Sequence, residues 1–420
     1  MPNERQLTDG PGGRILTNAN VWSPEGEWIV FDTRSDAAGE RFDGTRIQAV
    51  NVRTNEVRTV YESRNGAQCG VATWHPKDGK IIFIHGPENP TPEWSYGAPR
   101  RQGVIVDFEK RTTEPFDGRD LVPPFTPGAL RGGSHVHVFS PDGGKVSFTY
   151  EDQYLTRHER EVDGREINLR NVGVGVPAGL VRVGRGHPRN ADGTYFCVLV
   201  SKTTAHPKPG SDEISKAFEE GWIDNRTLAF QGHVVTQKGE TISEVFVVDL
   251  PDDLRAVGDG PLQGTESRRP LPPKGTRQRR LTFTADRKHP GLQGPRHWLR
   301  CSPDGSRIAF LMKDDAGVPQ LATVSPAGGK PSQLTRTTAG IASAFTWNAD
   351  GSHLAFVCDG RIAVADAGTG AIRFLTEPVP QAETPRPEAC VFSPDGKQIA
   401  FVRRRMANGK ESNQICVVDV

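Results

Sequence analysis

The chain of 420 residues lacks the features that mark several common classes of protein. Its 52 basic and 51 acidic side chains nearly cancel, so no general electrostatic attraction to nucleic acid or to an anionic membrane is expected. No run of about eighteen apolar residues occurs, and the start, MPNERQLTDG, has no apolar core of the kind that a secretory signal needs. These absences predict a cytoplasmic protein, or a periplasmic one if a leader has been removed.

Two short motifs are also missing. The six cysteines are never spaced as C-x-x-C, which argues against a zinc knuckle or a redox pair, and most lie in apolar runs that predict burial. No G-x-S-x-G occurs, which disfavours a serine peptidase with a propeller gate. What is present is a supply of turn-forming residues, with 46 glycines and 33 prolines, a composition suited to many short strands.

An internal repeat organises the chain. Each copy has a short strand, a polar turn with glycine, and a second strand that ends in phenylalanine. Proline sets φ at the first corner of the turn, aspartate bonds nearby backbone amides, and glycine takes the positive φ at which the chain reverses. The copies are NVWSPEGEWIVF (20–31), ATWHPKDGKIIF (72–83), HVFSPDGGKVSF (137–148), the weaker GWIDNRTLAF (221–230), RCSPDGSRIAF (300–310), TWNADGSHLAF (346–356) and VFSPDGKQIAF (391–401).

Two further strands follow most copies, the third often ending in a VVD-like pattern and the fourth often carrying Leu-Thr. Four antiparallel strands per repeat predict an all-β fold, a seven-bladed β-propeller that forms a single domain over residues 1–420. The start, ERQLTDG (4–10), has the fourth-strand pattern, so we expect it to complete the last blade and to remove exposed sheet edges. Because residues 186–202 resemble part of another copy, eight blades remain the alternative.

Two segments interrupt the rhythm of the repeat. The first is an insertion near 183–222, in which Ile214, Ala217, Phe218 and Trp222 are spaced as on one face of a short helix over 211–222. The second, residues 251–280, is rich in proline and glycine and predicts a surface loop.

The blades resemble the TolB-like bacterial propellers with WD40-like (PD40) repeats and, within them, the oligogalacturonate lyase group, as well as bacterial propellers of no assigned activity. SHVHVFSPDG (134–143) is similar to the His-x-His segment of the lyases, although Gly132 stands where that group has glutamine. The resemblance implies metal-assisted β-elimination from uronic-acid oligomers, a divalent metal such as Mn or Ca held by histidines, and no nucleotide cofactor. His135 and His137 are the residues to which it points.

Alignment of the repeats by their turns places candidate residues at the start of the innermost strands, where they could converge at the mouth of a funnel. The loop HGPENPTPEWSYGAPRRQG (85–103) adds aromatic and basic groups suited to a sugar acid. The predicted metal ligands are His135, His137, His233 and His297. The predicted catalytic residues are His135, Arg296 and His297. The predicted substrate-binding residues are Asn18, Trp94, Tyr96, Arg100, Arg101, Trp298 and Glu388.

Elimination from a uronate removes a proton beside a carboxylate, and a metal ion or an arginine must neutralise the developing charge while a neutral histidine accepts the proton. The resemblance, together with these residue types, therefore implies a lyase, or a related carbohydrate-binding enzyme, for small acidic oligosaccharides. The balance of charge predicts neither a nucleic-acid nor a membrane partner. Two alternatives stay open. The whole chain could be a non-catalytic propeller that binds a peptide or protein partner, and each histidine could be a channel-lining group bonded to backbone or water.

Overall fold

The computed structural model describes residues 3–36, 39–157, 160–407 and 410–420. Over these residues the chain forms seven antiparallel sheets of four strands each, and the helical structure consists of three short 3-10 turns, η1 (Ala98–Arg100), η2 (Leu155–Arg157) and η3 (Gln381–Glu383). The fold class is a seven-bladed β-propeller, as the repeats predict, and an eighth blade is not formed by the described residues. No described helix has the length and apolar character needed to cross a membrane.

Unit 1 is one of two compact units and comprises Met1–Arg64, Gln68–Ile81 and Thr282–Val420. It contains four complete sheets. In three of them strands that are consecutive along the chain pair with each other, and in the fourth the first strand of the chain pairs with the last. Their strands are β2 (Gly13–Ile15), β3 (Trp28–Arg34), β4 (Arg46–Asn51) and β5 (Val57–Glu62); β18 (Arg300–Cys301), β19 (Ile308–Lys313), β20 (Pro319–Val324) and β21 (Ser332–Gln333); β22 (Thr346–Trp347), β23 (His353–Cys358), β24 (Arg361–Asp366) and β25 (Ile372–Phe374); and β26 (Pro385–Phe392), β27 (Gln398–Ala407), β28 (Lys410–Asp419) and β1 (Glu4–Gln6).

Unit 2 comprises Asn65–Ala67 and Ile82–Leu281. It contains two complete sheets, and the boundary between the units falls within β7 of the remaining sheet. The complete sheets are β10 (Gly133–Phe139), β11 (Val146–Glu151), β12 (Asn171–Val181) and β13 (Gly193–Leu199), and β14 (Ala217–Trp222), β15 (Thr227–Val235), β16 (Thr241–Asp249) and β17 (Arg277–Arg280). The remaining sheet consists of β6 (Cys69–Trp74), β7 (Lys80–His85), β8 (Gln102–Asp107) and β9 (Thr113–Pro115).

The turn of the repeat forms as its residues predict. In the last copy the Ser393 hydroxyl donates to the Asp395 carboxylate over 2.6 Å and accepts the backbone N–H of Gln398 over 3.0 Å. Gly396 takes φ +72°, a left-handed conformation that costs glycine little. The turn thus satisfies its own polar groups and leads directly from β26 into β27.

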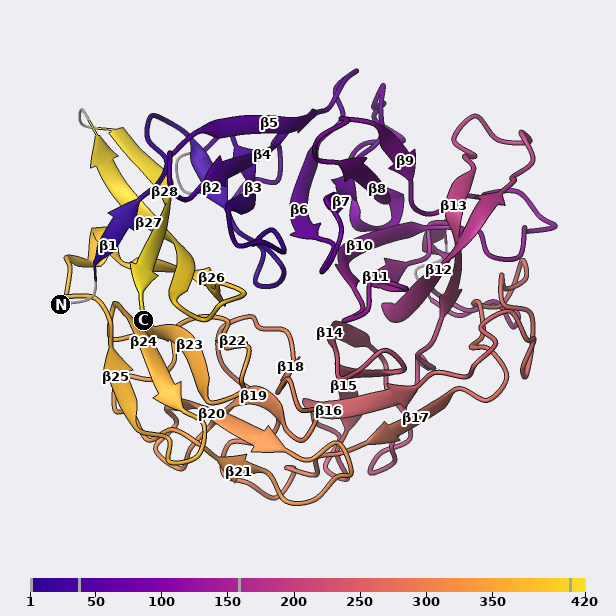
Figure 1. Cartoon of the computed structure of the whole chain (residues 1–420). Coiled ribbons are helices and arrows are strands. Elements are labelled where there is room, and N and C mark those ends of the chain that lie inside the picture. Colours follow the sequence, from indigo (N-terminus) through magenta and orange to yellow (C-terminus); the bar gives the residue numbers. More distant parts are fainter. Residues whose placement is uncertain (1–2, 37–38, 158–159, 408–409) are drawn as a thin grey trace. The chain divides into compact units, whose positions relative to one another are not determined.

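The two ends of the chain meet within unit 1, as the sequence predicts. The strand β1 pairs antiparallel with β28 and completes the sheet of β26, β27 and β28 (Figure 1). The Glu4 carboxylate lies 2.7 Å from the guanidinium of Arg403, which is fully buried, and 2.8 Å from that of Arg405. The indole of Trp22 donates to the carbonyl of Val391 over 3.0 Å, which ties the first sheet to the last.

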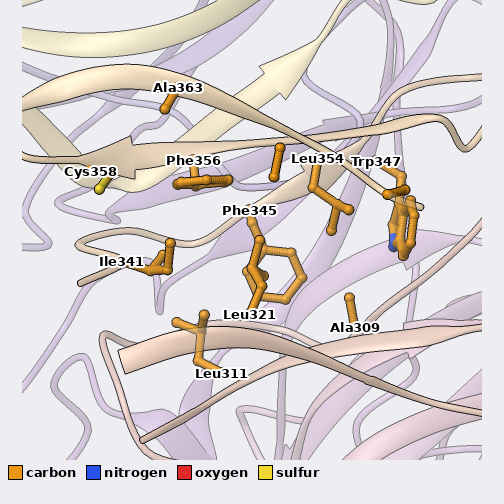
Figure 2. Packing of buried hydrophobic residues seen from close by; sticks show 12 residues of the cluster. Ala309, Leu311, Leu321, Ile341, Phe345, Trp347, Leu354, Phe356, Cys358 and Ala363 are labelled. Atoms are coloured by element: carbon orange, nitrogen blue, oxygen red, sulfur yellow. The ribbon is translucent and has the colours of Figure 1, made fainter. Parts of the chain in front are cut away.

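Apolar side chains fill the space between neighbouring sheets. In unit 1, the sheets β18–β21 and β22–β25 share a buried cluster in which Phe345 lies between Leu321 and Phe356 (Figure 2). The Trp347 indole at the edge of this cluster donates to the carbonyl of Arg300 over 3.0 Å. In unit 2, Trp222 makes the equivalent bond to Val138 over 3.0 Å, so the tryptophan at the end of an innermost strand is a recurring tie between sheets.

The helix expected over 211–222 is wrong. Residues Ala217–Trp222 form strand β14, which pairs with β15. Five of its six residues are buried, including Glu219 and Glu220, so burial does not alternate along the strand. Glu219 takes φ +55° where the register shifts, and this bulge produces a spacing of apolar residues that resembles a helix.

The insertion expected near 183–222 is also wrong, because part of this segment belongs to a regular sheet. Residues Gly193–Leu199 form β13, the fourth strand of the third sheet, and the segment after it leads into β14. The loop expected over 251–280 is irregular up to Thr276 and ends in β17. Five of the six cysteines are buried and all are free thiols, in line with the sequence prediction.

Candidate functional site

The residues predicted for the site divide between the two units. Unit 1 contains Asn18, Arg296, His297, Trp298 and Glu388, and unit 2 contains Trp94, Tyr96, Arg100, Arg101, His135, His137 and His233. The expected meeting of Asn18, His135, His297 and Glu388 spans both units and stays a prediction. Each group is therefore described within its own unit.

The two histidines of SHVH lie on β10 and flank a bulge. Val136 takes φ +58°, which is rare for a β-branched residue, and the pairing with β11 shifts register between His135 and Val138. His135 is 3% exposed and His137 is fully buried. Because of the bulge, the rule that residues two apart on a strand share one face does not apply to this pair.

His137 belongs to the core of unit 2. Its ring lies edge-on to Phe116, with 5.3 Å between the ring centroids, and its Nε2 is 2.9 Å from the Ser134 hydroxyl. Since that hydroxyl donates to the Asp117 carboxylate over 3.0 Å, Nε2 carries the proton and donates to Ser134. Burial, with a smaller contribution from Arg101, lowers the pKa of His137 to about 3. The imidazole is neutral near pH 7.

His297 has a backbone partner at each ring nitrogen. Nδ1 donates to the carbonyl of Pro295 over 2.9 Å, and Nε2 accepts the N–H of Leu311 over 3.1 Å. The Ser343 hydroxyl at the equivalent position of the next sheet accepts the N–H of Val357 in the same way, over 2.7 Å. Burial lowers the pKa of His297 to about 4. His297 thus substitutes for a missing strand bond, and metal ligation would require one of its bonds to break.

The other predicted residues of unit 1 have local partners. The Asn18 side chain and carbonyl accept from the guanidinium of Arg300. Glu388 pairs with Arg386 over 2.6 Å. The Arg296 guanidinium lies 4.5 Å from the centroid of the Trp298 ring and forms a cation–π pair with it.

His233 in unit 2 also packs against an aromatic ring. On β15 it lies edge-on to Phe218, with 5.0 Å between centroids. Burial, assisted by Lys216 and Arg170, lowers its pKa to about 4.

The predicted histidines do not fit a metal ion as they are placed. The described residues hold no group of three or more histidine, cysteine, aspartate or glutamate side chains that could share one ion. A divalent metal in a protein needs several such ligands with free lone pairs, and His297 and Nε2 of His137 have none to offer. A catalytic role for His135 or His297 stays a prediction.

The loop predicted to bind a sugar acid forms a denser site. Trp94 is presented by a turn in which its N–H donates to the carbonyl of Thr91 over 3.0 Å. Four groups surround its ring, with centroid distances of 5.2 Å for Arg100, 5.7 Å for Arg119, 5.9 Å for Arg189 and 5.9 Å for the ring of His187. We name Trp94, Arg100, Arg119, His187 and Arg189 the Trp94 cluster. Tyr96 and Arg101 form a separate pair beside it, 5.0 Å apart.

The arginines of the Trp94 cluster are held in place by backbone carbonyls. Arg119 donates through Nη2 to the carbonyls of Arg100 and Arg101, over 3.0 and 3.2 Å. Its own N–H donates to Ala191, so both its backbone and its side chain are fixed. Arg189 donates to the carbonyls of Glu88 and Asn89, over 2.6 and 2.8 Å, and so anchors the start of the 85–103 loop that carries Trp94.

Several donors of the Trp94 cluster are left over. Arg119 is 4% exposed, and its Nε is buried with no hydrogen-bond partner among the described residues. The indole Nε1 of Trp94 is likewise buried with no hydrogen-bond partner among the described residues. His187 accepts the N–H of Arg189 at Nδ1 over 3.0 Å, which leaves Nε2 as the protonated nitrogen of its neutral ring. Unused donors in a cationic setting are the condition for binding an anion.

The charges of the Trp94 cluster act on one another. Burial lowers the pKa of Arg119 to about 10; Asp117 opposes this effect and Arg189 adds to it. Burial and the charges of Arg157, Arg189 and Arg119 lower the pKa of His187. His85, at the end of β7, has its pKa lowered by burial and raised in part by Glu88. Both histidines are therefore neutral near pH 7, beside arginines that stay charged.

Sequence reasoning found Trp94 and Arg100 but missed Arg119, Arg189 and the role of His187. Arg119 lies between β9 and β10, and Arg189 and His187 lie between β12 and β13, outside the repeat pattern. The usable signal was the number of arginines in irregular segments, whereas their meeting at Trp94 depends on tertiary structure alone.

Comparison with known proteins gives a close relative. The chain is 50% identical over 402 residues to the uncharacterized protein YidR of Escherichia coli (strain K12), which covers 95% of this chain and 94% of that protein. A family model described as a protein of unknown function (DUF3748) matches residues 68–191. That segment includes every residue of the Trp94 cluster, together with Asp117, Ser134 and His137.

Solved structures share the fold at low sequence identity. An oligogalacturonate lyase in complex with manganese matches with a TM-score of 0.61 and 13% identity, over 99% of this chain and 93% of that chain. An oligogalacturonate lyase from Vibrio parahaemolyticus matches with a TM-score of 0.56 and 11% identity, over 100% of this chain and 97% of that chain. The expected resemblance to the lyase group is confirmed at the level of the fold.

Proposed function

Because the chain belongs to the family of Escherichia coli YidR and shares its fold with two oligogalacturonate lyases, we propose that it is a lyase-related enzyme that binds uronate-containing oligosaccharides at the Trp94 cluster. The observation that carries this proposal is the buried Arg119 beside Trp94, whose Nε has no hydrogen-bond partner among the described residues. A uronate unit presents both an apolar ring face and a carboxylate. Trp94 suits the first, and the arginines suit the second.

The same groups supply the elements of an elimination. Neutralisation of the uronate carboxylate by Arg119 and Arg189 makes the adjacent carbon-bound proton more acidic. His85 is neutral near pH 7 and is our candidate for the group that accepts this proton. His187 accepts at Nδ1 and therefore carries its proton at Nε2, and this Nε2–H is our candidate donor to a bound oxygen. In this scheme the bond between the ring carbon and the leaving sugar oxygen breaks as the carbon–carbon double bond forms. The leaving oxygen takes a proton from water, His85 later returns its proton to solvent, and an unsaturated uronate results.

The proposal is tested by comparing acidic and neutral oligosaccharides. We expect the purified protein to bind oligogalacturonate and not a neutral oligosaccharide of equal length, by titration calorimetry. The ultraviolet absorbance of an unsaturated uronate should increase on incubation. His85→Gln should retain the binding and lose the absorbance. Binding of neither sugar would contradict the proposal and favour the non-catalytic propeller that binds a protein or peptide.

A further inference from the structure

A chain of buried hydrogen bonds lies behind Arg119 and includes the His137 of the SHVH motif. His137 donates to the Ser134 hydroxyl over 2.9 Å, and Ser134 donates to Oδ1 of Asp117 over 3.0 Å. The backbone N–H of Gly103 donates to the same oxygen over 2.7 Å. A side chain at Gly103 would place its Cβ 2.9 Å from Nε2 of His137, so the close packing here depends on glycine. We name His137, Ser134 and Asp117 the relay.

The relay ends against Arg119 without a hydrogen bond between them. Asp117, Ser134 and His137 are fully buried. Oδ2 of Asp117 and Nε of Arg119 are both buried and have no hydrogen-bond partner among the described residues, although the charge of Arg119 lowers the pKa of Asp117. A buried carboxylate that lacks a full set of donors is costly in its charged form.

Few other charges face Asp117. Arg119 comes from its own segment, His137 from β10, and Cys197 from β13, where the Asp117 charge acts on the thiol. Arg101, next to β8, acts on His137. Burial raises the pKa of Asp117 to about 6, against the hydrogen bond from Gly103 and the charge of Arg119. The pKa of His137 is about 3, that of Arg119 is about 10, and that of Cys197 is well above its ordinary value. Within this group only Asp117 changes charge near pH 6.

We propose that anion binding at the Trp94 cluster is linked to protonation of Asp117, so that the relay sets how much of the Arg119 charge a ligand meets. The inference rests on the proposed function for the identity of the ligand. When Asp117 is ionised it offsets Arg119, and a carboxylate ligand meets a nearly neutral pair. When Asp117 is protonated, Arg119 is uncompensated and the ligand binds more tightly. By linkage, binding near pH 6 takes up a proton.

The variant Asp117→Asn isolates this charge, because an asparagine oxygen still accepts from Gly103 and Ser134. For oligogalacturonate as the probe, we expect the wild-type affinity to rise roughly tenfold as the pH falls from about 7 to about 5, the size of one unscreened charge several ångströms away. We expect the variant to bind at pH 7 with about the tighter affinity and to lose most of the pH dependence. The lowered pKa values of His85 and His187 place their titration below that of a free histidine, and any slope that they cause persists in Asp117→Asn. A variant with the same pH dependence as wild type would overturn the linkage.

A second variant and a second readout keep the test decisive. Ser134→Ala removes one donor from Asp117, so the midpoint of the affinity curve should move to higher pH; a midpoint that moves lower contradicts the relay. The wild-type free energy of unfolding, relative to that of Asp117→Asn, should rise as the pH falls through about 6 with no ligand present. If this titration is seen and oligogalacturonate never binds, the proposed function fails alone. If oligogalacturonate binds and neither curve responds to Asp117, this inference fails alone.

Discussion

The innermost strand β10 and the Trp94 cluster both place polar side chains in a buried setting, but they differ in what the fold leaves unused. On β10, the Nε2–H of His137 is committed to Ser134. In the Trp94 cluster, Arg119 donates through Nη2 to two carbonyls, and its Nε has no hydrogen-bond partner among the described residues. Residue type alone is therefore a poor guide to chemistry. Buried donors that have no hydrogen-bond partner within the fold are a better guide.

The largest effect should come from removal of the Arg119 guanidinium. Arg119→Met keeps much of the volume and removes the buried charge, so the affinity for oligogalacturonate should fall by about a hundredfold, in the range expected for a charged partner of a carboxylate. Titration calorimetry measures this change. Arg226→Met is a matched control in unit 2, because Arg226 pairs with Asp252 at the surface over 2.8 Å. Equal affinities for wild type and Arg119→Met would contradict the assignment of an anion site to the Trp94 cluster.

Much of the fold was readable from the sequence, and much of the site was not. Seven turns with similar chemistry predict seven four-stranded sheets because each turn is determined by a few adjacent residues, such as Ser393, Asp395 and Gly396. The strand β14 was misjudged because a bulge at Glu219 disturbs its period. Arg119 and Arg189 could not be paired with Trp94, because no local pattern links irregular segments that lie 25 and 95 residues from it in the sequence.

The histidines failed as a guide for a related physical reason. His297 was singled out by its place at the start of an innermost strand when the repeats are aligned by their turns. In the structure it accepts the backbone N–H of Leu311, as Ser343 accepts that of Val357. A sequence does not reveal whether a buried ring nitrogen faces a ligand or a backbone amide.

The next largest effect should separate stability from binding. His297→Ala removes two buried hydrogen bonds and leaves a cavity, so the free energy of unfolding should fall by about 3 kcal/mol. Uronate affinity should stay within about twofold of wild type. Urea denaturation and calorimetry measure the two quantities. A large loss of affinity with unchanged stability would instead support the predicted catalytic role of His297.

The lowered pKa of His297 also predicts how the free energy of unfolding changes with pH. The pKa of His297 is about 4 in the folded state, against about 6.5 for a free histidine. The unfolded chain therefore binds the extra proton first, and stability is lost as the pH falls below about 6.5. His297→Ala should flatten this loss between about pH 6 and pH 4.

The smallest effect should come from the indole that the arginines surround. Trp94→Phe keeps an aromatic face, loses the Nε1 donor and weakens the cation–π contacts, so oligogalacturonate affinity should fall about fivefold, equivalent to about 1 kcal/mol. The matched control is Trp298→Phe in unit 1, where Arg296 lies 4.5 Å from the ring centroid and no other arginine of the described residues stacks on that ring. If only Trp94→Phe weakens binding, the number of unused donors around a ring matters more than a single arginine–tryptophan contact. Equal losses from both variants would instead assign Trp298 to the ligand site as well. The number of donors without a partner would then not distinguish the two tryptophans.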